Sequence, residues 1–330
     1  MTKNMNILLE SIEKADTIAI AGHLRPDGDC VGSCMGLYCY ITQNYPKKRV
    51  TVYLSEFPEA FHYLKAEEAF VPCCRSEKGE GYDLFVSLDC GDADRLVEVA
   101  DILEQAGKVL NIDHHITNTK FGDENYVVPD ASSTSQILYT LLEDEKISYE
   151  AACALYTGII HDTGVFKHTN TSSETMRIAG KLMDKGIPFG KIIDGSFYMK
   201  TYKQLQIMGR CLLESIRIMD GRCIFSVVRR NIMELYNAVS SDLDGVIDEM
   251  RTTEGIEVAI LLKEEEPQEY KVSMRSNDVI DVSRIASYFG GGGHVHASGC
   301  VIKGDAFDVI NNLTRHIEEQ FMDAGQTVDG

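Results

Sequence analysis

The strongest constraint on the fold is an alternation of short apolar stretches with helix-like ones in the first half of the chain. Apolar or β-branched runs occupy residues 17–22, 49–54, 83–89 and 108–113. Helix-like stretches occupy residues 28–44, 94–106, 132–145, 149–160 and 172–185. This alternation predicts an α/β fold in which helices cover both faces of a parallel sheet. The ligand crevice of such a sheet lies beyond the carboxyl ends of its strands.

The pattern changes at DKGIPFGKIID (184–194), which contains glycine and proline and is followed by a helix-like stretch. The remainder predicts strands at 222–228, 256–262, 270–275 and 297–303, with helices near 231–237, 241–251, 281–288 and 306–322. A chain of 330 residues is long enough for two domains. We therefore expect a first domain over 1–190, a linker helix over 191–215 and a smaller α/β domain over 216–330.

Composition limits the partners and the location. The formal charge of −19 and the lack of a basic stripe argue against duplex DNA and anionic membranes. No apolar run approaches the roughly 20 residues that span a bilayer, and the N-terminal stretch has no signal-peptide pattern. A cytoplasmic location is the resulting expectation. The ten cysteines form no CxxC pairs, so we expect reduced thiols that pack as small apolar residues.

Acids and histidines recur where the predicted elements end. The motif GHLRPDGD follows the first strand, SLDCGDAD contains the end of the third, NIDHH ends the fourth, and HDTGVF ends an apolar helix. The residues concerned are His23, Asp27, Asp29, Asp89, Asp113, His114, His115 and Asp162. Any one acid there is explained as a helix cap or turn former. Their recurrence at four element ends instead predicts a shared site.

Charge arithmetic indicates metal ions. The four carboxylates of Asp27, Asp29, Asp89 and Asp162 would raise one another's pKa if they were clustered without cations. Two divalent cations would balance their charge, and a two-metal site suits displacement at phosphorus by an activated water. Mixed histidine and carboxylate ligands favour Mn²⁺, with Mg²⁺ or Co²⁺ as alternatives.

The same motifs carry a family resemblance. HLRPDGD, SLDCGDAD, DHH and HDTGVF resemble the four successive motifs of the DHH phosphoesterase superfamily. The segment VSMRSNDVIDVSRIASYFGGGGHVHASG resembles the nucleotide-binding second domain of its first subfamily. That subfamily includes nanoRNase-type oligoribonucleases and 3′-phosphoadenosine 5′-phosphate phosphatases. The related manganese pyrophosphatases lack this type of second domain.

The resemblance implies a division of roles within the first domain. One metal would be bound by His23, Asp27 and Asp89, and the other by Asp29, Asp89, His114 and Asp162, with Asp89 bridging. His115 would face the substrate as a catalytic imidazole. Asp113 would support the loop by accepting local hydrogen bonds, and its direct coordination of a metal stays an alternative.

The glycine-rich segment YFGGGGHVHASG predicts an anion-binding backbone rather than a linker, because a strand follows it at once. The resemblance assigns Gly292, Gly293, His294 and Ser298 to the substrate. Arg275 offers a guanidinium suited to phosphate or to base stacking. Arg25, inside the first motif, is a further candidate contact to phosphate.

The resulting hypothesis is a metal-dependent phosphoesterase of short oligoribonucleotides, of 3′-phosphoadenosine 5′-phosphate, or of linear and cyclic dinucleotides. Exonucleolytic release of mononucleotides fits the binding of one end of a short chain. The alternatives are an inorganic pyrophosphatase or polyphosphatase, and a nucleotide-binding protein without catalysis. The order of preference among the substrates stays open, as does the oligomeric state, with a homodimer among the options.

Overall fold

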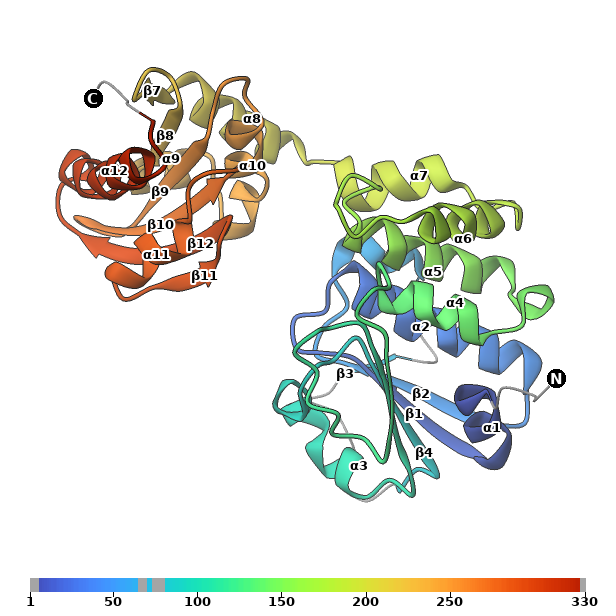
Figure 1. The fold of residues 1–330 in the computed structure, drawn as a ribbon. Coiled ribbons are helices and arrows are strands. Elements are labelled where there is room, and N and C mark those ends of the chain that lie inside the picture. Colours follow the sequence, from blue (N-terminus) through green and yellow to red (C-terminus); the bar gives the residue numbers. More distant parts are fainter. Residues whose placement is uncertain (1–5, 65–69, 73–80, 327–330) are drawn as a thin grey trace. The chain divides into compact units, whose positions relative to one another are not determined.

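The computed structural model describes residues 6–64, 70–72 and 81–326. The chain divides into two compact units, Met1–Met199 and Lys200–Gly330, and each is built around its own six-stranded sheet (Figure 1). Helices accompany both sheets, which confirms the predicted α/β class. None of the described helices is long and apolar enough to span a bilayer.

The sheet of the first unit is parallel throughout. Its strand order is β3-β2-β1-β4-β5-β6. The strands are β1 (Thr17–Ala21), β2 (Arg49–Leu54), β3 (Phe70–Pro72), β4 (Leu84–Leu88), β5 (Val109–Asp113) and β6 (Glu124–Val127). From β1 the chain winds outward to β2 and β3, then crosses back to β4 and continues the other way. The carboxyl ends of β1 and β4 therefore border the topological switch point, where a crevice for ligands forms.

Four of these strands match the sequence prediction, whereas the edge strands β3 and β6 were not predicted. β3 has only three residues, and β6 reads ENYV with every residue partly exposed. A three-residue strand and a largely polar four-residue strand show no clear alternation of their own. They become strands because a neighbouring strand offers its free hydrogen-bonding edge.

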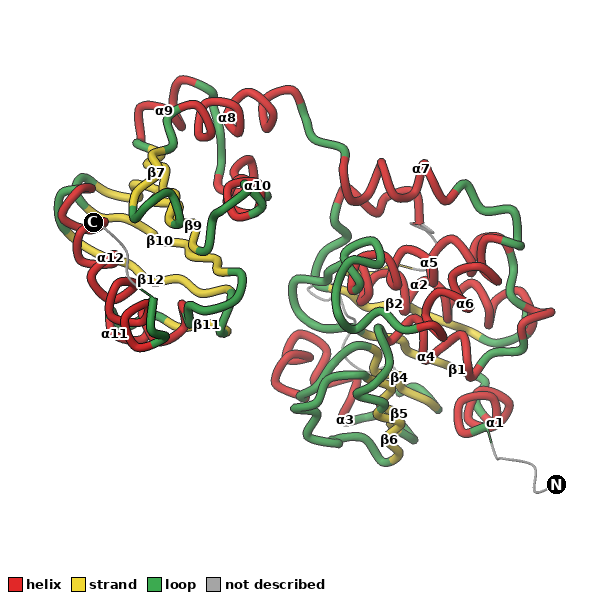
Figure 2. The backbone as a smooth tube through the Cα atoms, turned by 45° about the horizontal axis from the view of Figure 1, so that its top comes forward, coloured by secondary structure: helices red, strands yellow, loops and turns green. Residues whose placement is uncertain are grey.

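Both faces of the first sheet are covered by helices (Figures 1 and 2). Ile18 and Ile20 pack under the larger group of helices, while Ala19 and Ala21 face the 3₁₀ segment η3 and α3. This division follows from the alternation of side chains along a strand. The elements are α1 (Ile7–Lys14), α2 (Gly28–Asn44), η1 (Glu59–Leu64), η3 (Ala93–Val99), α3 (Ala100–Glu104), α4 (Thr134–Leu141), η4 (Asp144–Lys146), α5 (Tyr149–Asp162), α6 (Ser173–Met183), α7 (Phe189–Ile193) and η5 (Asp194–Tyr198).

Helices α2 and α5 approach each other closely because glycines line their contact. A Cβ atom on Gly32 would lie 2.6 Å from the Ala154 carbonyl oxygen, and one on Gly36 would lie 2.7 Å from a Leu155 methyl carbon. A Cβ on Gly158 would meet Ser135 Oγ at 2.0 Å. These glycines bring the start of α2 and the end of α5 to the same edge of the sheet.

The second unit contains a mixed sheet in the order β11-β12-β10-β9-β8-β7. One face packs against α11 and α12, and α8 and α10 cover part of the other. The strands are β7 (Ile216–Ile218), β8 (Cys223–Val228), β9 (Val258–Glu266), β10 (Glu269–Ser276), β11 (Gly292–His294) and β12 (Ala297–Lys303). The helices are α8 (Tyr202–Leu213), α9 (Arg230–Leu235), η6 (Ser240–Leu243), α10 (Val246–Arg251), α11 (Val282–Tyr288) and α12 (Ala306–Asp323).

Two details differ from expectation. The stretch 191–215 is not one helix, since η5 ends at Tyr198 and α8 begins at Tyr202, after a capping box formed by Thr201 and Gln204. The glycine-rich segment is itself part of a strand, β11, paired with β12. Cys73 and Cys74 lie outside the described residues, and the other eight cysteines form no disulfide.

The contact between α2 and α5 can be tested by a pair of glycine substitutions. Gly32→Ala should lower the stability of the protein by about 1–3 kcal/mol, because its methyl group would overlap the Ala154 carbonyl. Gly180→Ala on α6 is the control, since a Cβ there meets no atom within 4 Å. It should be neutral or stabilise by up to about 1 kcal/mol. Thermal unfolding measures both variants, and equal melting temperatures would contradict the close-contact interpretation.

Candidate metal centre

Six acidic and imidazole side chains gather at the carboxyl edge of the first sheet. The loop after β1 supplies His23 and Asp27, the first turn of α2 supplies Asp29, Asp89 directly follows β4, β5 leads into His114, and α5 ends with Asp162. The ligand atoms of these six and of a seventh residue, His115, form triads within 4.8 Å of one another: His23, Asp27 and Asp89; Asp29, His114 and Asp162; and Asp89, His114 and His115. The sequence-predicted residues therefore come together in space.

The first triad is arranged around His23. Its Nε2 lies 3.6 Å from Asp27 Oδ2 and 3.5 Å from Asp89 Oδ2. Its Nδ1 lies 2.8 Å from the Leu24 carbonyl oxygen. A carbonyl oxygen only accepts, so Nδ1 carries a proton, and Nε2 is left to hold either a second proton or a metal ion in front of the carboxylates. A metal-binding histidine needs its proton on the ring nitrogen that does not bind the metal, as here.

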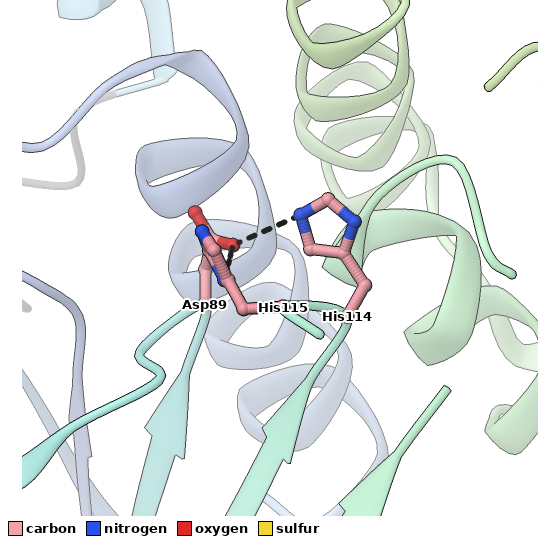
Figure 3. Close-up of side chains that lie close together, drawn as sticks. All are labelled: Asp89, His114 and His115. Carbon is pink, nitrogen blue, oxygen red and sulfur yellow. Dashed lines mark ion pairs between the residues drawn. The ribbon is translucent and has the colours of Figure 1, made fainter. Parts of the chain in front are cut away.

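His114 has the same arrangement on the other side of Asp89. Its Nδ1 donates to the Ala131 carbonyl oxygen at 3.4 Å, and its Nε2 lies 3.0 Å from Asp162 Oδ2 and 3.5 Å from Asp89 Oδ1. Asp89 thus turns Oδ2 toward His23 and Oδ1 toward His114. Figure 3 shows the contact with His114 and a second one, in which the same oxygen faces His115. A carboxylate oriented in this way is suited to bridge two cations.

Local backbone geometry explains how two of these acids are aimed. Asp27 caps α2, with Oδ1 accepting from the backbone amides of Asp29 and Cys30 at 3.1 Å, which leaves Oδ2 for the cluster. Asp89 has a φ of 54°, in the left-handed region that non-glycine residues seldom adopt. Such local strain persists where the surroundings enforce it, as they do at functional sites.

Asp29 is held by the start of α4, a contact that the sequence did not reveal. Its two carboxylate oxygens accept from the backbone amides of Thr134 (2.6 Å) and Ser135 (3.0 Å). Thr134 Oγ1 also donates to Asp89 Oδ1 at 3.2 Å. The helix N-terminus stabilises a negative charge there, so the SSTS segment acts as a support for the cluster.

The electrostatics of the cluster call for additional positive charge. Burial alone would lower the pKa of His23, but hydrogen bonds with Asp27 and Asp89 outweigh it and raise the pKa to about 11. Burial, and then the charges of Asp89 and Asp162, raise the pKa of Asp29 well above its ordinary value. Both shifts indicate that protons substitute for cations among these carboxylates.

A buried oxygen supports the same conclusion. Asp162 Oδ2 is buried and makes no properly oriented hydrogen bond within the described residues, although His114 Nε2 lies only 3.0 Å away. Because His114 Nδ1 donates to the Ala131 carbonyl, either a second proton on Nε2 or a cation must lie between Nε2 and the Asp162 carboxylate. The donor set of imidazole nitrogens and carboxylate oxygens fits divalent metal ions.

His115 borders the cluster, with its Nδ1 3.7 Å from Asp89 Oδ1, and is oriented by further hydrogen bonds. Its Nδ1 donates to Asp113 Oδ1 at 2.7 Å, which leaves Nε2 free. Asp113 Oδ2 accepts from the Asn118 amide at 2.6 Å, and that amide also donates to Asn111 Oδ1 at 2.8 Å. Asp113 is fully buried. It orients His115, and Asn118, which sequence reasoning missed, orients Asp113 in turn. The only sequence signal for Asn118 is its position five residues after Asp113.

Arg25 and five residues of the second unit complete the sequence-predicted set. Arg25 is exposed on the loop after β1, with a φ of 55°. Gly292, Gly293 and His294 are exposed on β11. A Cβ on Gly293 would lie 2.5 Å from the Ala297 carbonyl, so glycine is required there for strand pairing.

Arg275 and Ser298 lie on opposite faces of the second sheet. Arg275 pairs with Ala297 across β10 and β12, and Ala297 pairs with His294, so these three side chains form one row on one face. Ser298 instead faces the core, and its hydroxyl donates to the Val282 carbonyl oxygen at 2.6 Å. The structure thus places Arg275 and His294 together and Ser298 apart from them.

Solved and curated proteins resemble this chain over nearly its whole length. An exopolyphosphatase-related protein from Bacteroides fragilis has a TM-score of 0.82 at 24% identity, covering 94% of both chains. The bifunctional oligoribonuclease and PAP phosphatase NrnA of Thermus thermophilus is 29% identical over 98% of this chain and 96% of its own. NrnA of Bacillus subtilis is 26% identical over 89% of this chain and 92% of its own.

Family models match both units. The N-terminal domain of the DHH family matches residues 17–159, which include the strands that carry the acidic cluster and the DHH tripeptide itself. The DHHA1 domain matches residues 228–323, which include Arg275 and the glycine-rich strand. The chain therefore belongs to the DHH phosphoesterase family, in the subfamily that carries a DHHA1 domain.

Proposed function

We propose that this protein hydrolyses phosphoester bonds in short oligoribonucleotides and in 3′-phosphoadenosine 5′-phosphate, using two divalent cations. The observation that carries the proposal is the position of Asp89, whose two oxygens face the imidazoles of His23 and His114 in adjoining triads. The activities named for the relatives from Thermus thermophilus and Bacillus subtilis support this choice of substrates. We propose Mn²⁺ as the metal, because mixed nitrogen and oxygen ligands favour it over Mg²⁺.

We assign the ligands as the geometry groups them. His23 and Asp27 would hold one cation, Asp29, His114 and Asp162 the other, and Asp89 both. When bound, such ions make water a nucleophile at neutral pH and neutralise charge on the phosphoryl oxygens. Burial of Asp29 and Asp89 excludes bulk water from this side of the site, which strengthens electrostatic interactions there.

We assign to His115 the proton transfer to the leaving oxygen. Its free Nε2 carries a proton in the imidazolium form, and its contact with Asp113 raises its pKa, so that form is favoured. Arg25 and Arg275 are candidate contacts to phosphate oxygens, which a guanidinium binds well. Hydrolysis of inorganic pyrophosphate is the second enzymatic candidate, but it leaves no role for a DHHA1 domain.

A comparison of substrates tests the proposed function. Rates on pApA, a pentaribonucleotide, 3′-phosphoadenosine 5′-phosphate and pyrophosphate should be measured side by side with Mn²⁺. The nucleotide substrates should be turned over and pyrophosphate should not. Preferential hydrolysis of pyrophosphate would refute the proposal in favour of its rival.

The metal assignment predicts a change in stoichiometry. His114→Ala should leave one of two Mn²⁺ ions after dialysis, as measured by elemental analysis. Turnover by this variant should fall by more than roughly 100-fold. Loss of a residue that only hydrogen-bonds to a metal ligand costs about 10–100-fold. His316→Ala on α12, where the imidazole contacts Glu319, is the control and should keep both ions. Full metal content and activity in His114→Ala would contradict the two-metal site.

The network behind His115 predicts a defect specific to proton transfer. Asn118→Ala should lower kcat by about 10–100-fold with KM and metal content unchanged, because Asp113 and His115 lose their orientation. The defect should vanish with a p-nitrophenyl phosphoester, whose leaving group needs no proton. Asn125→Ala, which removes a side-chain amide that hydrogen-bonds to the backbone of Gly122, is the matched control. An equal loss on both leaving groups would exclude this role.

A further inference from the structure

The sheet of the second unit has one unevenly covered face. Val272 and Met274 of β10 point into the core beneath α11 and α12. Successive side chains of a strand point to opposite faces, so Lys271, Ser273 and Arg275 lie on the other side. On that side α8 and α10 cover β8 and β9, whereas Lys271 of β10 is exposed and Arg275 is half-buried.

A cavity of about 310 Å³ lies where the helical cover ends. Leu243, Ile247 and Leu261 give it an apolar wall. Its charged lining consists of Lys263, Lys271, Arg275, Asp244 and Asp248. The cations outnumber the carboxylates, and Asp248 is already 3.6 Å from the Arg275 guanidinium. Apolar surface beside cations and carboxylates matches the parts of a nucleotide, with its base, phosphate and hydroxyl groups.

Two of the lysines oppose each other directly. Lys271 pairs with Lys263 in the register of β10 and β9, and like charges at directly opposed positions are destabilising. Lys263 contacts Ser240 Oγ and Glu265 Oε1. Lys271 makes no hydrogen bond or ion pair within the described part of the chain, and it is exposed. A phosphate between the two ammonium groups would relieve their repulsion.

The cavity shares its face with the row formed by His294, Ala297 and Arg275. Strands lie roughly 4.8 Å apart and rise about 3.4 Å per residue. His294 is therefore about 10 Å from Arg275 across the sheet, and Lys271 is about 14 Å from Arg275 along β10. A ligand that reaches from Arg275 to Lys271 must be longer than one phosphate group.

We propose that this cavity is a separate subsite for one further nucleotide unit of an oligoribonucleotide, with its phosphate between Lys263 and Lys271. The base would lie on Leu243 and Ile247, and Asp244 would accept hydrogen bonds from ribose or base. This proposal rests on the proposed function. It adds a second nucleotide-binding position to the one at Arg275. Because 3′-phosphoadenosine 5′-phosphate has a single nucleoside, it cannot occupy both positions. Lys271 is then a residue that distinguishes the two substrate classes.

Binding without turnover tests the subsite independently of catalysis. A fluorescently labelled pentaribonucleotide is titrated with the metal-free full-length protein at several salt concentrations. Lys271→Gln should weaken binding about fivefold and reduce the slope of log affinity against log salt by about 0.7, the value for one phosphate contact on a single strand. Lys303→Gln removes the same charge from the same sheet face outside the cavity, where Lys303 contacts Glu269. It should change neither quantity.

Steady-state kinetics with Mn²⁺ complete the test. Lys271→Gln should raise KM for the pentaribonucleotide about fivefold, with kcat and the KM for 3′-phosphoadenosine 5′-phosphate within about twofold of the parent protein. Equal effects on both substrates, equal effects of Lys303→Gln, or an unchanged salt slope would each overturn the subsite. If the parent protein turns over neither substrate, the proposed function fails instead, and the binding titration still decides the subsite.

Discussion

Repulsion among four carboxylates at one edge of a sheet is the constraint on which the rest of the first unit depends. Asp29 and Asp89 are almost completely shielded from water, so the solvent cannot screen their charge. Part of the compensation comes from the protein itself, through the N-termini of α2 and α4 and the imidazoles of His23 and His114. The remainder must come from protons or cations, and the Nδ1 hydrogen bonds of both histidines leave their Nε2 atoms available to bind cations.

The scaffold keeps these charges together by close packing at a distance from the site. Gly32 and Gly36 on α2 leave space for the backbone and Leu155 of α5, so that Asp162 at the end of α5 comes near Asp29 at the start of α2. The parallel pairing of β4 with β1 adds Asp89, which directly follows β4. Rigid secondary structure of this kind holds ligands more accurately than loops alone. The candidate metal centre and the hydrophobic core of the first unit are therefore built from the same helices and strands.

The sequence predicted the elements whose signals are local. The four central strands of the first sheet are short apolar runs, and every candidate ligand was identified by its place at the end of an element. Asp27 fits both the helix-cap and the metal-ligand interpretations, because one of its oxygens caps α2 while the other faces His23. The edge strands β3, β6, β7 and β11 were missed, since short, exposed strands depend on the neighbour with which they pair. The glycine run became a strand for the same reason.

By itself, the sequence determined the fold class, the order of the central strands along the chain, and which acids and histidines stand at element ends. Periodicity, turn chemistry and residue type carry that information within a few neighbouring positions. Only the tertiary structure decided how these groups divide their work. It directs the two oxygens of Asp89 toward different histidines, fixes His115 through Asp113 and Asn118, supports Asp29 with Thr134, and sets Lys271 opposite Lys263. Contacts between residues as far apart in the sequence as Asp29 and Thr134 depend on strand order and helix packing, which no local pattern encodes.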